Sequence, residues 1–394
     1  MLHAALESVR GERVVADYLA AHRPPRPSAL LSVGKAACSM AAGALAHWPG
    51  LDGLVVTKPG HLAPGCRALE CIEAGHPEPD AESLRAGRRV REWIAGTPHD
   101  ASLMFLLSGG ASALLEALPA GVELEALVRL NRWLLASGLP IDQVNALRQR
   151  VSLVKAGRLA RVLAGRRVLQ LVISDVPDDR LDIIGSAPLY PVAWPPLPAH
   201  LPHWVAALLD RAPPPLAADE PAAAWVSSHI LASNGHARRA AVAAAVERGL
   251  AVHEHAAPLA GEAAGLGEQL ARSLLEGPDG LHVWGGETTV TLPPHPGRGG
   301  RNQHLALAAA RELAGQGGVW LLAVGTDGSD GPTEEAGALI DGGSVARGEA
   351  AGEDAARALR HADAGTFLEA AGDLVDTGPT GTNVMDLVLG LRIR

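Results

Sequence analysis

Residues 29–40 read ALLSVGKAACSM, in which an apolar run typical of a buried strand is followed by a glycine and a helix-like run. Strand, glycine turn and helix in this order form the repeating unit of α/β proteins. Lys35 stands directly after the glycine, where the N-terminus of a helix commonly binds phosphate groups. The stretch therefore predicts an α/β fold with an anion-binding loop at Lys35. The alternative is a lysine retained there by chance.

The same alternation continues along the chain. Strand-like runs lie at 29–33, 53–57, 69–73, 102–107 and 168–174, and helix-like segments lie at about 36–47, 80–95, 123–137 and 151–164. This is the pattern of a doubly wound α/β domain. Proline-rich segments follow, and the alternation then resumes. We expect two domains, an α/β domain at 1–222 that ends in a proline-rich linker and a smaller α/β domain at 223–394.

Composition narrows the functional class. The 394 residues are 47% hydrophobic and 20% charged, with a net charge of −9 and 3% aromatic residues. No basic cluster is interleaved with aromatic residues, which argues against a nucleic-acid partner. No apolar run is long enough to cross a membrane, and the cysteines form neither CxxC pairs nor an even framework. We expect a soluble cytoplasmic protein with reduced cysteines that acts on a small molecule.

Two segments of the first domain carry groups that suit an anion. The serine and glycines at 108–110 end a buried strand and Ser112 opens a helix, which predicts a phosphate or carboxylate cradle. A plain tight turn is the alternative. Farther along, Asn145, Arg148 and Lys155 recur over several helical turns, where a solvated charged face is the alternative to a binding surface.

Candidates for cation binding and charge stabilisation stand in other loops. Asp327 and Asp330 lie among glycines after an apolar run, and carboxylates at this spacing can share one Mg²⁺, although a solvated Asx turn would look the same. Asp175 ends a strand and is either a metal ligand or a turn residue. Arg301 opens a helix after a glycine loop, where a guanidinium can reach an anion, and Glu287 follows two glycines at a strand end.

The motifs taken together resemble one family. In chain order they are SVGKAA, VVTKPGH, EAGHPEPD, LLSGGASALL, VNALRQRVSLVKAGRLA, LVISDVPDD, GGETTVTL, GRGGRNQ, GTDGSDGPTEEAGALIDG and DTGPTGTNVMDL. They resemble the type II glycerate 2-kinases, which join a DUF4147 domain to a C-terminal MOFRL domain. The resemblance implies ATP-dependent phosphorylation of D-glycerate to 2-phosphoglycerate and ADP, with Mg²⁺. It also implies a Rossmann-like first domain and an active site in the cleft between the domains.

The resemblance also assigns residues. It places the catalytic lysine, arginine and aspartate on Lys35, Arg301 and Asp327, with Asp327 as a metal ligand or as the base that accepts the hydroxyl proton. Asp175 and Asp330 are further metal candidates. The substrate and nucleotide candidates are Ser108, Gly109, Gly110, Ser112, Asn145, Arg148, Lys155, Asn234, Glu287, Gly325 and Thr326.

Three positions depart from the family pattern. Ala111 stands where the family's SGGGSAL has a third glycine, GSAPL at 185–189 with Ala187 replaces ASGPT, and His304 replaces the glutamate of RNQE. Ala111 cannot adopt a positive φ as easily as glycine, so we expect a differently shaped cradle. These departures leave the exact hydroxy acid open.

Two other functions use the same architecture. An NAD(P)H-dependent hydroxypyruvate reductase is one, but the chain has no GxGxxG fingerprint. A non-catalytic protein that binds small hydroxy acids is the other. The oligomeric state is open, and a homodimer is one option.

Overall fold

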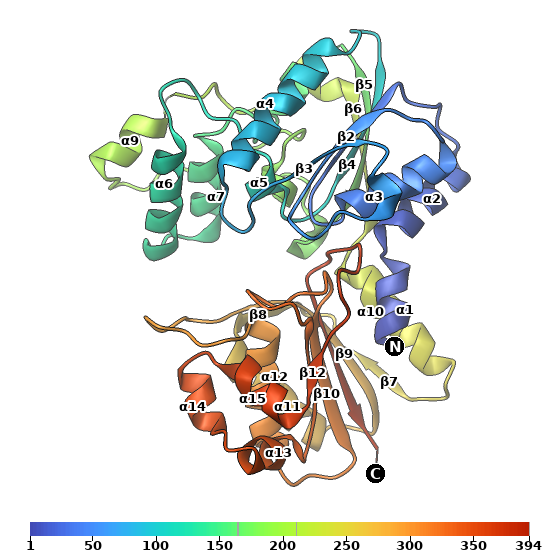
Figure 1. Cartoon of the computed structure of the whole chain (residues 1–394), viewed down its shortest axis with the longest axis vertical. Helices are drawn as coiled ribbons and strands as arrows, with labels where there is room; N and C mark the ends of the chain where they lie inside the picture. The colour runs from blue at the N-terminus through green and yellow to red at the C-terminus, as the bar shows by residue number, and fades with distance from the viewer. Residues whose placement is uncertain (164, 210, 394) are drawn as a thin grey trace. The chain divides into compact units, whose positions relative to one another are not determined.

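The computed structural model describes residues 1–163, 165–209 and 211–393 and divides into two compact units. The N-terminal unit is Gly11–Leu231, and the C-terminal unit is Ala232–Arg394 together with Met1–Arg10. Helices and strands alternate along both units (Figure 1), which confirms the predicted α/β class.

The sheet of the N-terminal unit has the strand order β3-β2-β1-β4-β5-β6. Parallel pairing joins β1 to β2 and β4, β2 to β3, and β4 to β5. This is the order of a doubly wound Rossmann-type sheet. The direction in which successive strands are added to the sheet reverses between β1 and β4. The strands are β1 (Ala29–Val33), β2 (Gly53–Thr57), β3 (Glu70–Glu73), β4 (Ser102–Leu107), β5 (Arg167–Ile173) and β6 (Val226–Ala232).

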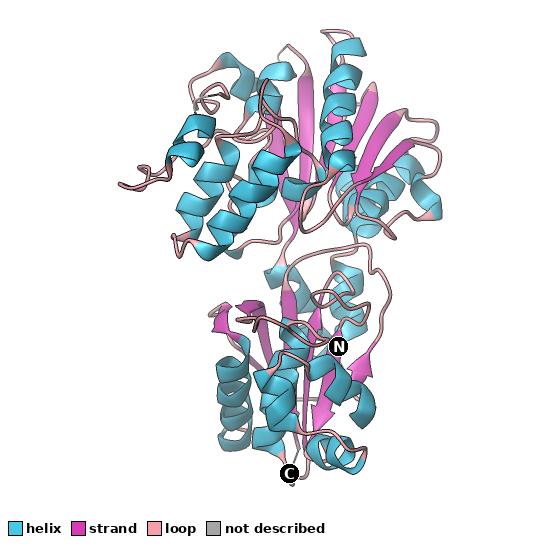
Figure 2. Ribbon diagram, turned by 60° about the vertical axis from the view of Figure 1, so that its left-hand side comes forward, coloured by secondary structure: helices cyan, strands magenta, loops and turns pink. Residues whose placement is uncertain are grey.

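Helices cover both faces of this sheet (Figure 2), so its central strands are buried along their whole length. Val33 and Phe105, for example, pack in one apolar cluster with Val90 and Ile94 of α4. The helices are α2 (Gly11–His22), α3 (Ala37–His47), α4 (Ala81–Gly96), α5 (Ala111–Leu114), α6 (Leu124–Ala136), α7 (Ile141–Gln149), α8 (Arg158–Val162) and α9 (His203–Leu209), with short 3-10 turns η1 (Pro64–Cys66), η2 (Pro177–Asp179), η3 (Ile184–Ser186) and η4 (Pro221–Trp225).

The predicted helix at 151–164 is wrong over its first half. The chain forms α7 before it and α8 only from Arg158, and residue 164 lies outside the described residues. Ala156 and Gly157 between the two helices have φ of 54° and 74°. A right-handed helix cannot run through such residues, so the segment bends there.

The C-terminal unit is built on a mixed sheet of order β12-β11-β10-β13-β9-β7, with β8 also paired to β9. Neighbours are antiparallel except for β7 and β8, which run parallel to β9. The strands are β7 (Val252–Glu254), β8 (Leu259–Glu262), β9 (Gly280–Thr289), β10 (Val319–Gly325), β11 (Gly337–Asp341), β12 (Leu374–Val375) and β13 (Asp386–Arg392). The helices are α1 (Leu2–Ser8), α10 (Asn234–Val246), α11 (Ala263–Glu276), α12 (Arg301–Leu313), α13 (Ser344–Ala350), α14 (Ala355–Arg360) and α15 (Ala364–Ala371).

The observed division of the chain differs from the predicted boundary at 222/223 in two respects. Residues 226–231 stay with the N-terminal unit because β6 joins its sheet beside β5, where Ser228 Oγ donates to Gln170 Oε1 at 2.7 Å. The first helix, α1, belongs instead to the C-terminal unit, where it packs on α10. Tertiary pairing therefore decides both assignments.

The expectation of three reduced cysteines is wrong for two of them. Cys38 at the start of α3 and Cys66 in η1 form a disulfide with a Cα–Cα distance of 5.2 Å, and both residues are buried. Cys71 remains a free thiol, and burial raises its pKa. Sequence spacing did not reveal this pair because the fold brings the two segments together. Within the described part of the chain, no helix has the length and apolarity needed to cross a bilayer.

Helix α12 begins without a side-chain cap of its own, because Gly300 occupies the N-cap position. Asp330, from the loop after β10, supplies the missing acceptors. Its Oδ1 accepts from the backbone N–H of Asn302 at 3.0 Å, and its Oδ2 accepts from that of Gln303 at 2.8 Å. Asp330 is fully buried, and this burial raises its pKa to about 7. A carboxylate 28 residues away in sequence thus caps the helix.

We predict that Asp330→Ala lowers the free energy of unfolding by about 1–3 kcal/mol, because two buried N–H groups of α12 lose their acceptors. Urea unfolding followed by circular dichroism measures the change. Asp219→Ala, at an exposed aspartate, is the matched control and should change stability by less than about 0.5 kcal/mol. Equal stability of the two variants would contradict the capping role.

The raised pKa of Asp330 also predicts a pH dependence. Because the folded-state value of about 7 exceeds the ordinary value of 3.8, folding favours the protonated acid. This contribution to stability is complete below about pH 4 and is lost as the pH rises through about 7. Wild-type protein should therefore lose stability relative to Asp330→Asn over that interval, as measured by urea unfolding at several pH values. A difference that stays constant with pH would show that Asp330 does not titrate there.

Candidate functional site

The loops after β1 and β4 lie against each other in the N-terminal unit. Lys35 N–H donates to Gly109 O at 2.9 Å, and Ala36 N–H donates to Ser108 Oγ at 3.0 Å. Gly34 has a φ of 129°, and a Cβ on it would lie 2.2 Å from Ser108 Oγ. Only glycine allows this approach. The structure therefore places Lys35 beside the predicted cradle, at the carboxyl ends of the two strands between which the sheet order reverses.

The side chains of Lys35 and His76 both lie close to Gly110. A Cβ on Gly110 would lie 3.1 Å from Lys35 Cγ and 3.2 Å from His76 Cδ2, so a larger residue would crowd both. His76 follows β3 in the EAGHPEPD motif, whose position at a strand end was the available sequence signal. It joins the candidate site as a residue that the sequence-based assignment omitted.

A pocket of about 350 Å³ opens beside this cradle, and its lining residues all belong to the N-terminal unit. They are His76, Pro77, Glu78, Pro79, Gly110, Ser112, Ala113, Leu127, Asn131, Arg148 and Lys155. Of the predicted binding residues, Ser112, Arg148 and Lys155 thus meet at one cavity with Gly110. Asn145 lies on α7 but is not among the lining residues.

Lys155 is neutralised inside the fold. Its Nζ lies 2.6 Å from Glu116 Oε2, and both side chains are buried. Ser152 Oγ donates to the other Glu116 oxygen at 2.5 Å. Glu116 carried no motif that marked it in the sequence, and only the fold reveals it as the partner of Lys155.

Arg148 has a different environment. It is half-buried, and its Nε donates to Asn131 Oδ1 at 3.1 Å. Burial lowers the pKa of Arg148 from its ordinary value. Among the described residues no carboxylate forms an ion pair with it. Asn131, on α6, is a further pocket residue that the sequence did not indicate.

Two of the departures from the family pattern lie side by side. A Cβ on Gly185 would lie 3.1 Å from the Ala111 Cβ, so the methyl group present at 111 occupies space beside the methyl group missing at 185. Ala111 begins α5 and the positive φ of 83° belongs to Gly110, so Ala111 does not have to adopt the conformation that favours glycine. Ala187, where the family has glycine, does adopt a φ of 54°.

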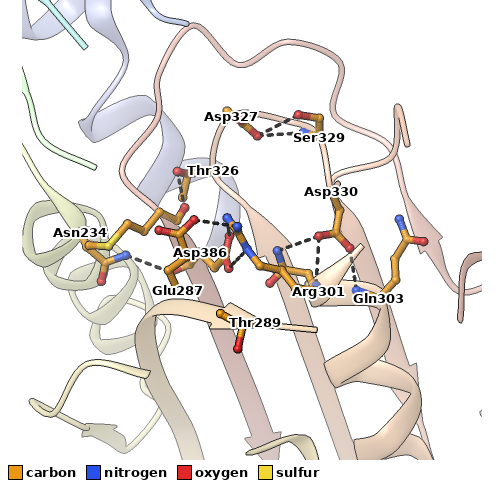
Figure 3. Close-up of polar contacts among 12 residues, drawn as sticks. Asn234, Glu287, Thr289, Arg301, Gln303, Thr326, Asp327, Ser329, Asp330 and Asp386 are labelled. Atoms are coloured by element: carbon orange, nitrogen blue, oxygen red, sulfur yellow. Dashed lines mark hydrogen bonds and ion pairs between the residues drawn. The ribbon is translucent and has the colours of Figure 1, made fainter. Parts of the chain in front are cut away.

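In the C-terminal unit, Arg301 forms ion pairs with the carboxylates of Asp386 and Glu287 (Figure 3). Its Nε and Nη2 donate to the Asp386 carboxylate at 2.7 and 3.2 Å, and its Nη1 lies 2.6 Å from Glu287 Oε1. Burial by itself lowers the pKa of Arg301, but the negative charges of Asp386 and Glu287 outweigh it and raise the pKa above its ordinary value. Asp386 is buried and was not predicted, although it stands in the DTGPTGTNVMDL motif.

Asp327 lies in the loop that follows β10 and forms the Asx turn that was the alternative to metal binding. Its Oδ1 accepts from Ser329 N–H at 3.0 Å and from Ser329 Oγ at 3.1 Å. Asp327 is buried rather than exposed. A Cβ on Gly328 would lie 2.0 Å from Gly378 O, so the DTGPTGTN loop packs directly on this turn. The turn holds the carboxylate in one orientation.

Thr326 and Asn234 support the start of β13. Thr326 Oγ1 donates to Met385 O at 2.6 Å, and Asn234 Nδ2 donates to the carbonyl oxygens of Val384 and Asp386, both at 2.9 Å. Met385 has a φ of 67°, a conformation that a bulky side chain rarely adopts. Both predicted binding residues thus act on the backbone next to Asp386. Gly325 ends β10 immediately before them.

The described residues contain no group of three His, Cys, Asp or Glu side chains that could hold a metal by themselves. Asp330, one of the metal candidates, uses both oxygens on α12, and Asp175 lies half-buried at the end of β5. Magnesium in phosphoryl-transfer sites commonly takes one or two carboxylates and completes its shell with phosphates and water. The oriented carboxylate of Asp327 fits that mode.

Residues 1–195 match the family described as "Domain of unknown function (DUF4147)", and residues 280–386 match the MOFRL family. A Thermotoga maritima protein named D-glycerate 2-kinase is 37% identical over 385 residues, which cover 92% of this chain and 90% of that protein. The Pyrococcus horikoshii protein named glycerate 2-kinase is 32% identical over 387 residues, covering 92% and 86%. An Agrobacterium vitis protein named putative hydroxypyruvate reductase is 37% identical over 382 residues, covering 93% and 87%.

A solved structure agrees with these sequence matches. The crystal structure of glycerate kinase from Thermotoga maritima has a TM-score of 0.84 and 34% sequence identity, and the superposition covers 100% of this chain and 97% of that one. The relatives and the structure thus match along the chain, in both units. The chain belongs to the glycerate 2-kinase family, in which a DUF4147 domain precedes a MOFRL domain.

Proposed function

We propose that the protein transfers the γ-phosphoryl group of ATP to the 2-hydroxyl of D-glycerate, giving 2-phosphoglycerate and ADP, with Mg²⁺. The observation that carries the proposal is the position of Lys35, whose side chain lies close to Gly110 at the carboxyl ends of β1 and β4. Doubly wound sheets bind anionic ligands at this edge. Relatives named as glycerate 2-kinases support the same reaction.

Lys35 stabilises the charge that spreads over the transferring phosphoryl oxygens. Phosphoryl transfer needs little covalent chemistry from the protein, and placement and charge stabilisation supply most of the acceleration. An ammonium on a flexible stem is a compact point charge, which suits a loop whose backbone already approaches closely. Ser108, Gly109 and Gly110 hold that loop in place and present it to the anion.

Arg301 provides the second positive charge. The buried Asp386 accepts hydrogen bonds from two nitrogens of Arg301, and the half-exposed Glu287 forms an ion pair with its Nη1. The exposed partner is the easier one to exchange for a phosphate oxygen, because water can solvate the released carboxylate. Asp386 thus orients the guanidinium, and Nη1 turns to the phosphoryl group.

Asp327 would hold the metal ion through its oriented carboxylate. Bound Mg²⁺ supplies Lewis-acid stabilisation of the phosphate charges. The two hydrogen bonds from Ser329 fix the side chain before any ligand arrives, so binding does not require the loss of its rotamer freedom. Asp175 and Asp330 are not needed for this role.

Phosphorus NMR of the products formed from ATP, Mg²⁺ and D-glycerate tests the reaction directly. A 2-phosphoglycerate resonance with equimolar ADP is expected. Oxidation of NADH by hydroxypyruvate in place of that signal would establish the reductase activity instead. Glycerate-induced thermal stabilisation with neither turnover would establish a binding protein.

We predict that Lys35→Ala lowers kcat by at least about a hundredfold with the fold intact, the scale of losing one preorganised charge donor. Lys35→Arg should also be impaired, because the planar guanidinium cannot occupy the place of the ammonium. Steady-state kinetics at saturating ATP and glycerate measure both. Arg88→Ala removes an exposed cation of the same unit and should keep normal turnover. Wild-type kcat in folded Lys35→Ala would refute the role of Lys35.

We predict that Asp327→Asn abolishes phosphoryl transfer while the free energy of unfolding changes by about 1 kcal/mol or less, because the amide oxygen can still accept from Ser329. The matched control is Asp376→Asn. Asp376 is exposed and makes the same kind of turn, accepting from Gly378 N–H at 2.9 Å. Coupled ADP assays over a range of Mg²⁺ concentrations measure both variants. Loss of activity in the control to the same degree would indicate a loop effect rather than metal binding.

A further inference from the structure

Half-buried Arg148 differs from Lys155 and Arg158, two buried cations of the N-terminal unit, in the contacts that its charged group makes. Lys155 forms an ion pair with Glu116, and Arg158 donates to the carbonyl oxygens of Gln149 and Ser152 at 2.7 and 2.9 Å. Arg148 lines the pocket, and its Nε donates to a neutral amide oxygen, Asn131 Oδ1. No carboxylate among the described residues pairs with it. A desolvated cation without an anion is costly, so the arrangement favours an anionic ligand.

The geometry of the Arg148 guanidinium suits a carboxylate. The single contact to Asn131 uses Nε, which leaves the two terminal nitrogens for a planar, two-oxygen acceptor. Asn131 is itself nearly buried on α6, so it holds the guanidinium plane in one orientation. Lys155 cannot take this role as well, because Glu116 already offsets its charge.

The rest of the pocket supplies a hydroxyl site and apolar walls. Gly110, which lies close to the Lys35 side chain, lines the same cavity, together with Ser112. Leu127 and Ala113 contribute apolar surface. Glu78 also lines the cavity, but it is exposed, so solvent screens its charge. A small ligand that carries both a carboxylate and hydroxyl groups matches this lining.

We propose that this pocket is the subsite for the 2-hydroxy acid, in which Arg148 binds the substrate carboxylate and Asn131 positions Arg148. The inference rests on the proposed kinase function and assigns its acid-binding end to the N-terminal unit. It excludes Lys155 as the carboxylate ligand. Asn131 is a positioning residue, because it acts on the substrate only through Arg148.

The test compares Arg148→Lys and Asn131→Ala with wild type. Arg148→Lys keeps a positive charge but loses the planar fork, so KM for D-glycerate should rise at least about tenfold while KM for ATP stays unchanged. Asn131→Ala should raise the same KM by a smaller factor. The preference for glycerate over its neutral amide, glyceramide, should fall in both. Arg132→Lys, an exposed neighbour of Asn131 on α6, is the matched control and should keep both KM values.

Binding of D-glycerate without nucleotide, measured by isothermal titration calorimetry, separates this inference from the kinase reaction. Weaker glycerate binding by Arg148→Lys than by wild type supports the subsite even if no phosphoryl transfer is detected. Wild-type KM, binding and glyceramide discrimination in folded Arg148→Lys would overturn it while leaving the kinase function standing. A KM that rises equally for ATP and glycerate would also overturn it, because it would indicate a general structural effect.

Discussion

The buried carboxylate of Asp330 links the two segments on which the C-terminal site depends. It accepts hydrogen bonds from the first turn of α12 and stands three residues after Asp327 in the loop that follows β10. Because Arg301 is the first residue of α12, the capping contact sets where its side chain leaves the helix. Burial raises the pKa of Asp330 to about 7, because placing a charged carboxylate inside the fold is unfavourable in free energy. The hydrogen bonds from the helix N–H groups offset part of this free energy.

In the N-terminal unit, the corresponding constraint is the close approach of two loops, which leaves no room for a Cβ at a glycine position. The loops after β1 and β4 approach so closely that a Cβ at Gly34 would overlap Ser108. β1 and β4 are parallel neighbours and end at the same edge of the sheet, so the residues that directly follow them lie side by side there. A Cβ on Gly185 would lie 3.1 Å from the Ala111 Cβ, so the methyl group at position 111 leaves little room for one at position 185.

Positive charges inside the protein are balanced in three different ways, and the difference separates structural from ligand-binding roles. Lys155 forms an ion pair with Glu116, and Arg301 forms ion pairs with one buried and one exposed carboxylate. Arg148 meets a neutral amide. A cation that the fold already neutralises gains little from a substrate anion, whereas one that lacks a carboxylate gains most. The sequence motifs mark all three residues as site candidates but do not show which of them the fold pairs with a carboxylate.

The sequence by itself determined the α/β class, the order of the strands along the chain and the loops that carry chemistry, because periodicity and glycine turns are local properties. It also determined the family, through motifs such as GTDGSDG and DTGPTGTN. Only the tertiary structure decided which residues meet. Glu116 and Asn131 carry no local signal, and the motif that contains Asp386 does not reveal its partner, yet each contacts a basic residue distant in sequence. Such pairings depend on packing between elements far apart in the chain, which the local pattern of residues does not encode.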